Sequence, residues 1–435
     1  MHRSVWQAAA AGLALAGAVG IANVAASADR GRADPPHAAP AGSRIRDLDI
    51  EFYRTRVARD PRSARDFTQL AGLYLQRARE TADNEDLERA EETARHSLAL
   101  RRGRNDAAYG VLASSLMGQH RFAEALETAR ALLAADSTSI AARGMVAEAE
   151  LELGQYADAG REFGRLGSYQ ADLGVAPRLA RWAELRGRPD EARRLLRQAV
   201  SEASRRHGMP REQVAWFHLR LGDLALRAGH LPEAERELHA GLAILPGDHR
   251  LLGTLARLHT VRHNWREATE VGELAVSRAL DPATLGLLHD AWTALGDSAR
   301  AAEYYRAMAV SVLRQPGPYH RAWSLFLLDH EREVPRVLTN VESELRTRHD
   351  VYGFDLLAWA LHRSGRDAEA RAPMARALAL GTRDAMLFYH AGMIARALGD
   401  TALARARLDT ALAINPYWDP TQPGEARALL DSLTR

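Results

Sequence analysis

The chain has 435 residues, of which 46% are hydrophobic and 26% are charged, so it is long enough to bury a large core. Its 58 basic residues, all of them arginine, nearly balance 56 acidic residues. The resulting net charge of +2 argues against the strongly positive field of a nucleic-acid-binding protein. Cysteine is absent, which excludes disulfide bonds, thiolate metal sites and a lipid-modified N-terminal cysteine.

Residues 1–28 have a basic start, an alanine-rich apolar stretch and a final small-residue pattern, ASA. This order is typical of a secretory signal peptide, so we expect export to the periplasm or the cell exterior, with cleavage after Ala28. An uncleaved N-terminal membrane anchor is the alternative, although Asn23 and several glycines make the segment a poor spanning helix. The Pro-, Gly- and Ala-rich residues 29–43 predict a disordered linker. No later segment is apolar enough to span a membrane.

From residue 66 to residue 416, turn sequences followed by alanine recur, as in GQYADA from Gly154 and GRDAEA from Gly365. The alanine position recurs every 33–35 residues, apart from one interval of 42 before Ala234. These anchor positions are Ala90, Ala125, Ala159, Ala192, Ala234, Ala268, Ala301, Pro335, Ala370 and Ala404. A regular period of this length predicts a stack of similar units, each touching only its neighbours.

Each unit shows the apolar spacing of two amphipathic helices, such as the i, i+4 pair Leu238 and Leu242. A small residue stands twelve positions before most anchors, where we expect two helices to approach closely: Ala113, Ala147, Ala180, Gly222, Ala256, Ala358 and Gly392. In most units Gly or His ends the first helix, because a left-handed backbone conformation is needed there. The pattern predicts an all-α superhelix of about ten hairpins over residues 44–435, with capping helices over 45–59 and 423–433.

Two units depart from this pattern. The seventh has His289 in the position of the small residue. The eighth has Trp323 in that position and Pro335 in place of the anchor alanine. We therefore expect the eighth unit to be the least regular, and it is a candidate for a bend in the stack.

The sequence resembles the tetratricopeptide repeat family from residue 66 to residue 416, and it is similar to exported bacterial proteins of that family. The matching residues are the pairs Leu112–Ala113, Leu221–Gly222 and Leu357–Ala358, the anchor alanines, the apolar residues Phe163, Leu238 and Tyr305 that follow anchors by four, and the closing prolines Pro246, Pro282 and Pro416. The resemblance implies an α-α superhelix. It also implies a non-catalytic scaffold or adaptor that binds a protein or peptide segment.

Chemistry-bearing motifs are missing from the sequence. It contains no HExxH, GxSxG, GxGxxG or phosphate-cradling GxxxxGK[ST] pattern, so we predict no enzymatic activity and no cofactor. Four histidines, His120, His230, His263 and His330, fall at equivalent turns. Adjacent units are about 10 Å apart, the helix-packing distance, which is too far for imidazoles alone to share an ion. We therefore predict no metal site.

The first helices of such hairpins line the concave face of a solenoid, where their free side chains contact partners. Positions one and four residues after the small residue, with some near the helix starts, predict a partner-binding groove. Its residues are Glu148, Arg181, Glu184, Trp216, Asp223, Arg257, Asp290, Asp355, Trp359, His362, Tyr389, Met393 and Arg396. The last five belong to two adjacent units and predict an aromatic pocket, with a small molecule or glycan as the alternative ligand. Burial of Trp359 and Tyr389 in the core is the competing interpretation.

Overall fold

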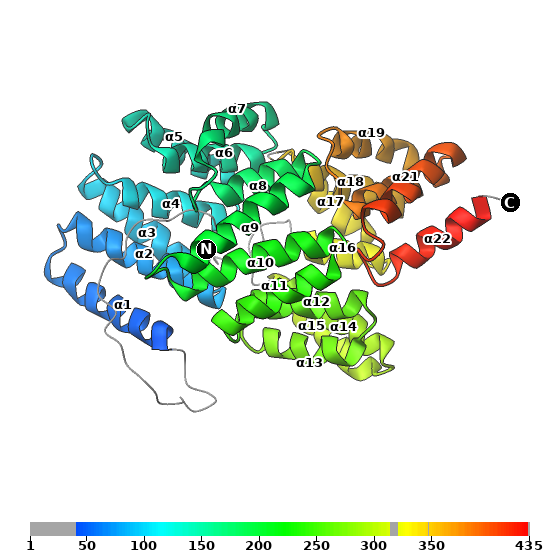
Figure 1. Ribbon diagram of the computed structural model, residues 1–435, viewed down its shortest axis with the longest axis horizontal. Coiled ribbons are helices and arrows are strands. Elements are labelled where there is room, and N and C mark those ends of the chain that lie inside the picture. The colour runs from blue at the N-terminus through cyan, green and yellow to red at the C-terminus, as the bar shows by residue number, and fades with distance from the viewer. Residues whose placement is uncertain (1–40, 314–320, 347, 434–435) are drawn as a thin grey trace, which may run out of the picture.

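The computed structural model describes residues 41–313, 321–346 and 348–433. Within these ranges the chain forms 22 α-helices and one short 3₁₀ helix, with no strand, so the predicted all-α superhelix is confirmed (Figure 1). The expected signal peptide and most of the expected linker lie outside the described residues. The last three linker residues, 41–43, belong to the first helix instead. Among the described helices, none combines the length and apolarity needed to cross a membrane.

Ten helical hairpins form the stack. Their first helices are α2 (Ala64–Thr81), α4 (Asp106–Gly118), α6 (Ile140–Glu152), α8 (Ala176–Leu185), α10 (Arg211–Arg227), α12 (His249–Val261), α14 (Pro282–Ala294), α16 (Arg321–Asp329), α18 (Val351–Arg363) and α20 (Ala385–Ala397). Their second helices are α3 (Asn84–Leu100), α5 (Phe122–Ala135), α7 (Tyr156–Leu166), α9 (Pro189–Arg205), α11 (Leu231–Ile244), α13 (Trp265–Val276), α15 (Ser298–Leu313), α17 (Val334–Glu344), α19 (Asp367–Leu378) and α21 (Thr401–Ile414). The 3₁₀ helix η1 (Gly167–Tyr169) follows α7, and α1 (Ala41–Arg59) and α22 (Gln422–Leu433) flank the stack.

The small residues and anchors set the distance between the two helices of a hairpin. Ala234, an anchor, is fully buried. A Cβ on Gly222 would lie 3.1 Å from the side chain of Leu238, and one on Gly392 would lie 2.7 Å from that of Leu408. The helices therefore pack too closely at these positions for a larger side chain without adjustment, as the sequence predicts.

The turn that ends the first helix has a left-handed residue in most units. Gly154, Gly229 and Gly365 have φ of 74°, 76° and 72°, while His120 and His263 take the same conformation with φ of 57° and 58°. These two histidines therefore adopt the left-handed backbone conformation that the turn requires. Among non-glycine residues, histidine is enriched in that conformation.

The eighth hairpin contains the shortest of the first helices, α16, with nine residues. Trp323 is buried and its ring stacks on that of Phe326, with ring centroids 5.9 Å apart. Pro335 lies in the first turn of α17, where its missing N–H has no helical partner to lose. Trp323 therefore lies on a shortened first helix, and Pro335 occupies a position in the first turn of α17 that tolerates proline.

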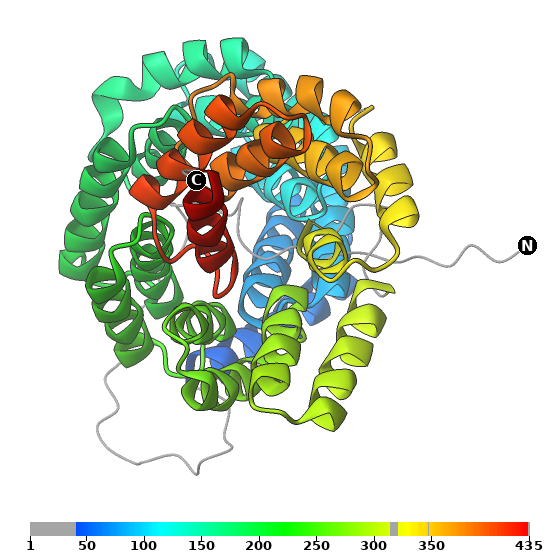
Figure 2. The same ribbon diagram turned by 90° about the vertical axis from the view of Figure 1, so that its right-hand side faces the viewer.

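Viewed along its long axis, the stack forms a ring, and later hairpins return to lie against earlier ones (Figure 2). Gly187 has φ of 70°, and a Cβ there would lie 2.2 Å from the carbonyl oxygen of Gly381. A Cβ on Gly154 would lie equally close to the carbonyl oxygen of His349. The superhelix is thus closed by backbone contacts between segments almost two hundred residues apart.

A third turn joins the same interface. A Cβ on Gly229 would lie 2.8 Å from Oδ1 of Asn415, and the Nδ2 atom of Asn415 donates to the carbonyl oxygen of Leu226 at 3.2 Å. Asn415 is fully buried, so these bonds satisfy an amide that would be costly to bury unpaired. Three consecutive hairpin turns of the N-terminal half therefore receive three successive segments of the C-terminal half.

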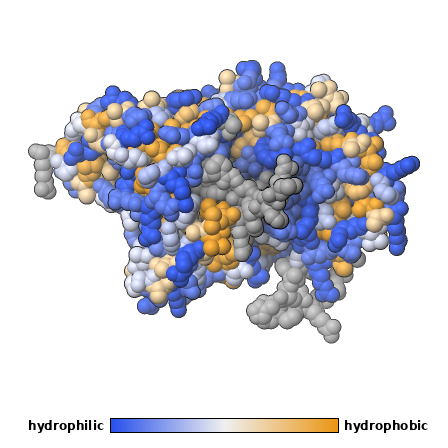
Figure 3. All heavy atoms as spheres, turned by 180° about the vertical axis from the view of Figure 1, so that it is seen from behind, coloured by the Kyte–Doolittle hydropathy of each residue, from blue (hydrophilic) through white to orange (hydrophobic). Residues whose placement is uncertain are grey.

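The two flanking helices differ in their surroundings. Helix α1 packs on α2 but leaves Ile45, Leu48 and Phe52 exposed. Helix α22 packs on α21 at the C-terminal end and projects over the middle of the ring in Figure 2. Seen from behind, hydrophilic residues cover most of the surface between scattered apolar patches (Figure 3).

Candidate partner-binding surface

The first helices form a continuous layer, which we call the inner face. Each contacts the next first helix along most of the stack, as α2 contacts α4, α12 contacts α14, and α18 contacts α20. In a repeat stack, the layer whose neighbours touch most directly lies on the shorter, concave side. The predicted groove residues lie on these helices, and their exposure varies along the stack.

Among the charged residues that directly follow the small-residue position, exposure is greatest in the sixth and seventh hairpins. At the position after the small residue, the side chains of Arg257 on α12 and Asp290 on α14 are 42% and 40% exposed. The equivalent Arg181 on α8 is buried, and Asp223 on α10 is about one-fifth exposed. We call the inner face of α12 and α14 the open segment, because it leaves both a cation and an anion accessible.

Five predicted or neighbouring residues form an ion-pair ladder across α8, α10 and α12. Arg257 donates to Asp223 at 2.9 Å, and Asp223 also binds Arg227 at 3.0 Å. Arg227 in turn pairs with Glu184, which lies 3.4 Å from Arg181. The charges alternate, so each buried group has a partner of opposite sign. Most of the predicted polar groove is thereby used within the protein itself.

The ladder ends at the interface between the two turns of the superhelix. The guanidinium of Arg181 lies 5.5 Å from the ring centre of Tyr352 on α18. Nearby, Arg348 donates to the Glu152 carboxylate at 3.0 Å across the same interface. Burial raises the pKa of Glu152, and the positive charge of Arg348 opposes that shift. These charged residues therefore help to hold the ring closed.

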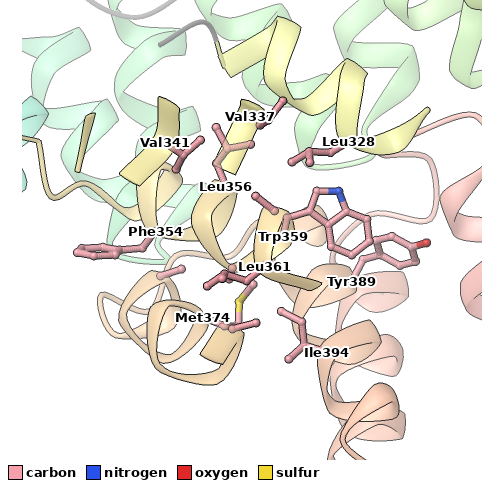
Figure 4. Close-up of a cluster of buried hydrophobic side chains, with 14 of the residues drawn as sticks. Leu328, Val337, Val341, Phe354, Leu356, Trp359, Leu361, Met374, Tyr389 and Ile394 are labelled. Atoms are coloured by element: carbon pink, nitrogen blue, oxygen red, sulfur yellow. The ribbon is translucent and has the colours of Figure 1, made fainter. Parts of the chain in front are cut away.

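The predicted aromatic pocket is corrected by the structure, because its main residues are core residues. Trp359 and Tyr389 are each 2% exposed and lie among Leu328, Ile394 and other apolar side chains (Figure 4). The Nε1 atom of Trp359 donates to Asp329 at 2.9 Å. These rings therefore offer no free face to a ligand.

Residues of the C-terminal segment help to cover the rings of Trp359 and Tyr389. The sequence did not predict this contact. Tyr389 donates to Glu425 on α22 at 2.6 Å, and its ring centre lies 5.7 Å from that of Trp418. His390 stacks on Trp359 at 4.1 Å. A helix predicted as a cap thus also contacts the predicted pocket.

Asp355 is corrected for the same reason. It is fully buried, and its Oδ1 lies 2.7 Å from Nδ1 of His390, also fully buried, while Arg321 lies 3.5 Å from its other oxygen. A carboxylate held between two cationic or polar groups inside the protein is a structural element. It cannot contact a partner on the inner face.

The remaining predicted residues are dispersed. Glu148 accepts from Arg178 at 3.0 Å, Trp216 packs half-buried in the core, and His362 pairs with Asp367. Met393 packs against the C-terminal core, and Arg396 is exposed. The predicted groove residues of α8, α10 and α12 therefore contact one another in the ladder. Those of α18 and α20 do not belong to it.

One cluster on the inner face includes a residue that the predicted groove omitted. His289 and Asp290 on α14 lie beside His330, whose Nε2 is 2.9 Å from Oδ1 of Asp290. The available signal was the departure of His289 from the small-residue pattern, because a polar ring placed at a close helix contact needs a hydrogen-bonding partner.

Comparison with known proteins agrees with the repeat assignment. Residues 183–258, from the end of α8 into α12, match the tetratricopeptide repeat family. A search among curated protein sequences gives no match. Similar solved structures include the human IFIT1 dimer with PPP-AAAA, at 16% identity and a TM-score of 0.49, covering 73% of each chain.

Two longer alignments have lower scores. The Cut9–Hcn1 hetero-tetramer of the APC/C aligns with 91% of this chain and 94% of the other, at 13% identity and a TM-score of 0.35. Yeast Tom70 aligns with 90% of this chain and 93% of its own, at 11% identity and a TM-score of 0.34. The match to the tetratricopeptide repeat family covers residues 183–258, and hairpins of the same kind continue on both sides of it in the described residues.

Proposed function

We propose that the protein is a non-catalytic scaffold that binds a protein or peptide segment on the open segment of the inner face, α12 and α14. The observation that carries this proposal is the exposure of Arg257 and Asp290, at 42% and 40%. At equivalent positions in the fourth, fifth and ninth hairpins, the side chains are buried or only about one-fifth exposed. Arg257 and Asp290 are themselves paired with Asp223 and His330, but among these positions their charges are the most accessible to a partner.

The chemistry of the open segment suits a polypeptide ligand. Arginine is enriched at protein interfaces because its planar guanidinium forms several directed hydrogen bonds to carboxylates and carbonyl groups. Arg257 is held in place by its bond to Asp223, so less side-chain freedom is lost on binding. The sequence also lacks the catalytic motifs that would support an enzymatic role for this surface.

The small-molecule or glycan alternative receives no support from the C-terminal aromatic residues. Sugar binding by stacking requires an open ring face, whereas Trp359 is covered by His390 and Tyr389 lies against Trp418.

We further propose that the scaffold acts after export to the periplasm or the cell exterior of a bacterium. This proposal rests on residues 1–28, with their basic start, apolar stretch and small-residue end. A scaffold in that compartment cannot rely on disulfide bonds here, because the sequence contains no cysteine. Packing between repeats must supply its stability.

Site-specific photo-crosslinking tests the proposed surface. A photoreactive amino acid is placed at residue 293, which is exposed on α14 and leaves Arg257 and Asp290 in place, and in a second variant at residue 236, which is exposed on the second-layer helix α11. Both variants are irradiated in cells of the source organism, and the adducts are identified by mass spectrometry. The proposal expects a defined protein adduct from position 293 alone. Equal adducts from both positions, or none from 293, would contradict it.

A further inference from the structure

We propose that His289, Asp290 and His330 form a binding site for a divalent transition-metal ion, with Zn²⁺ as the expected ion. The three residues each offer a ligand atom, and these atoms lie within 4.8 Å of one another. They come from two consecutive first helices, since His289 and Asp290 are on α14 and His330 directly follows α16. The site shares Asp290 with the open segment, but metal binding needs no partner and can be tested without one.

Backbone hydrogen bonds set the protonation of both rings. Nδ1 of His289 lies 2.8 Å from the carbonyl oxygen of Ala301, and Nδ1 of His330 lies 2.7 Å from that of Phe326. A carbonyl oxygen only accepts, so each Nδ1 must carry the proton. In a neutral ring this leaves Nε2 with the lone pair. A backbone carbonyl bonded to the non-ligating nitrogen is a common second partner of metal-binding histidines.

The contact between His330 and Asp290 places a ring nitrogen and a carboxylate oxygen where one cation could bind both. With Nδ1 already donating, the 2.9 Å contact from Nε2 of His330 to the Asp290 carboxylate requires a second ring proton. A metal ion between the two would replace that proton and accept both the nitrogen lone pair and a carboxylate oxygen.

Aromatic rings support the two imidazoles. Phe326 stacks on His330 with ring centres 4.1 Å apart and meets the His289 ring at 5.2 Å. The His289 and His330 rings are themselves 5.5 Å apart and nearly perpendicular. All three candidate ligands are half-buried, so they are restrained yet still reachable from solvent.

The donor set selects the class of metal. Two imidazoles and one carboxylate suit Zn²⁺ and neighbouring late transition metals, whereas Ca²⁺ and Mg²⁺ prefer oxygen ligands alone. Zinc bonds of about 2.0–2.2 Å in a tetrahedral arrangement place ligand atoms about 3.3 Å apart. The most widely separated ligand atoms therefore need to close by up to about 1.5 Å, while Nε2 of His330 and Oδ1 of Asp290, now 2.9 Å apart, need to separate slightly. Three protein ligands leave a fourth position for water or for a side chain of a bound molecule.

The site also accounts for the irregularity of the seventh hairpin. The repeat places a small residue where His289 stands, and the bond to the carbonyl oxygen of Ala301, the anchor of that hairpin, satisfies the ring in this close contact. His289 lies within α14 and reaches the neighbouring turn at His330, so the two ring centres are 5.5 Å apart. Histidines at equivalent turns of adjacent hairpins are expected to be about 10 Å apart, which is why the turn histidines alone predict no metal site.

A Zn²⁺ titration of tag-free, chelator-treated full-length protein tests the proposal by isothermal calorimetry. The variant His289→Ala restores the small residue of the repeat and is therefore expected to fold, as checked by circular dichroism. The matched control is His239→Ala, which removes an exposed histidine from α11. His330→Ala and Asp290→Asn provide two further tests that do not alter the helix contact at 289.

We expect one Zn²⁺ per chain in the wild type and in His239→Ala. Loss of a direct ligand is expected to weaken binding more than about 100-fold, beyond the 10- to 100-fold cost of losing an outer-shell partner. When Co²⁺ replaces Zn²⁺, the wild type is expected to show the visible absorption of a four-coordinate site. The three ligand variants are expected to lack it. The absence of saturable one-to-one binding, or unchanged affinity in His289→Ala, His330→Ala and Asp290→Asn, would overturn the proposal.

Discussion

The hydroxyl of Thr382 donates to the carbonyl oxygen of Leu185 at 2.6 Å, although the two residues are 197 positions apart. Thr382 follows Gly381, whose carbonyl oxygen faces Gly187 at the end of the α8 turn. The bond therefore belongs to the interface that closes the superhelix. It joins two hairpins that are remote in the stack and adds long-range contacts to the nearest-neighbour contacts of a repeat protein.

Replacing Gly187 tests this interface. Gly187→Ala places a methyl group 2.2 Å from the Gly381 carbonyl oxygen and also strains a left-handed residue. Gly296→Ala is the matched control, because Gly296 has φ of 82° but no atom within 4 Å of the added carbon. The backbone strain costs about 1–2 kcal/mol in each, and steric overlap adds about 1–3 kcal/mol in Gly187→Ala alone.

The urea midpoint and the solution radius of gyration measure the difference. Gly187→Ala is expected to unfold at lower urea than Gly296→Ala and to have a larger radius of gyration. Equal midpoints and equal radii for the two variants would show that the ring is not closed by this contact in solution.

A second prediction concerns Trp359, which the structure places in the core. Trp359→Ala is expected to lower stability by about 3–5 kcal/mol, because a large buried ring leaves a cavity. Arg396→Glu changes an exposed residue in the next hairpin and is expected to leave the melting temperature within about 2 °C. Thermal unfolding followed by circular dichroism compares them. A Trp359→Ala protein that is fully helical and as stable as the wild type would contradict the burial of Trp359 in the core.

A third prediction concerns the pH dependence of Asp248, which caps α12. Burial alone would raise the pKa of Asp248, but its ion pair with Arg250 and hydrogen bonds to the helix N-terminus lower it overall. The folded-state pKa therefore lies below the unfolded value of about 3.9. The stabilisation is present above about pH 4 and is lost as the pH falls toward the lowered pKa.

Asp248→Asn keeps a capping oxygen but removes the charge. At pH 7 the variant is expected to be less stable by about 1.5–3 kcal/mol, the usual value of hydrogen bonds to a charged group. Urea midpoints at pH 7, 4 and 3 measure the stability gap between the wild type and Asp248→Asn. This gap is expected to narrow between pH 4 and pH 3. A gap that stays constant down to pH 3 would be inconsistent with the charge as its cause.

The hairpins could be predicted from the sequence because their cause is local and repeated. Gly222 lies twelve residues before Ala234, and the same spacing recurs in most units, so each unit independently reports the same helix contact. Ten hairpins follow directly from that interval. The spacing also marked the eighth unit, with Trp323, as irregular, although it did not predict that α16 would be short.

Closure of the ring could not be predicted in this way. Gly187 and Gly296 have the same place in the repeat, yet only Gly187 faces another superhelical turn. Which residues meet depends on the small rotation between units summed over about six hairpins, and the sequence does not give that rotation. For the same reason, the contact of Tyr389 with Glu425 could not be predicted. The position of a residue in the repeat predicts the helix face on which it lies, but not which distant segment packs against that face.

Export gives a fourth prediction. N-terminal sequencing of the protein recovered from its native compartment is expected to start at Asp29, because the small-residue pattern ends at Ala28. Substituting Ala28 by a bulky residue is expected to leave the longer precursor. A native protein that retains residue 1 would instead support the N-terminal anchor.

The most direct test of the proposed function is the affinity of the crosslinked partner for charge-reversal variants. Arg257→Glu reverses the accessible cation of the open segment, and Arg236→Glu makes the same change on exposed helix α11. We expect Arg257→Glu to raise the Kd at least about tenfold, or about 1.4 kcal/mol, and Arg236→Glu to leave it within about twofold. An unchanged Kd for a folded Arg257→Glu protein would contradict binding on the inner face of α12 and α14.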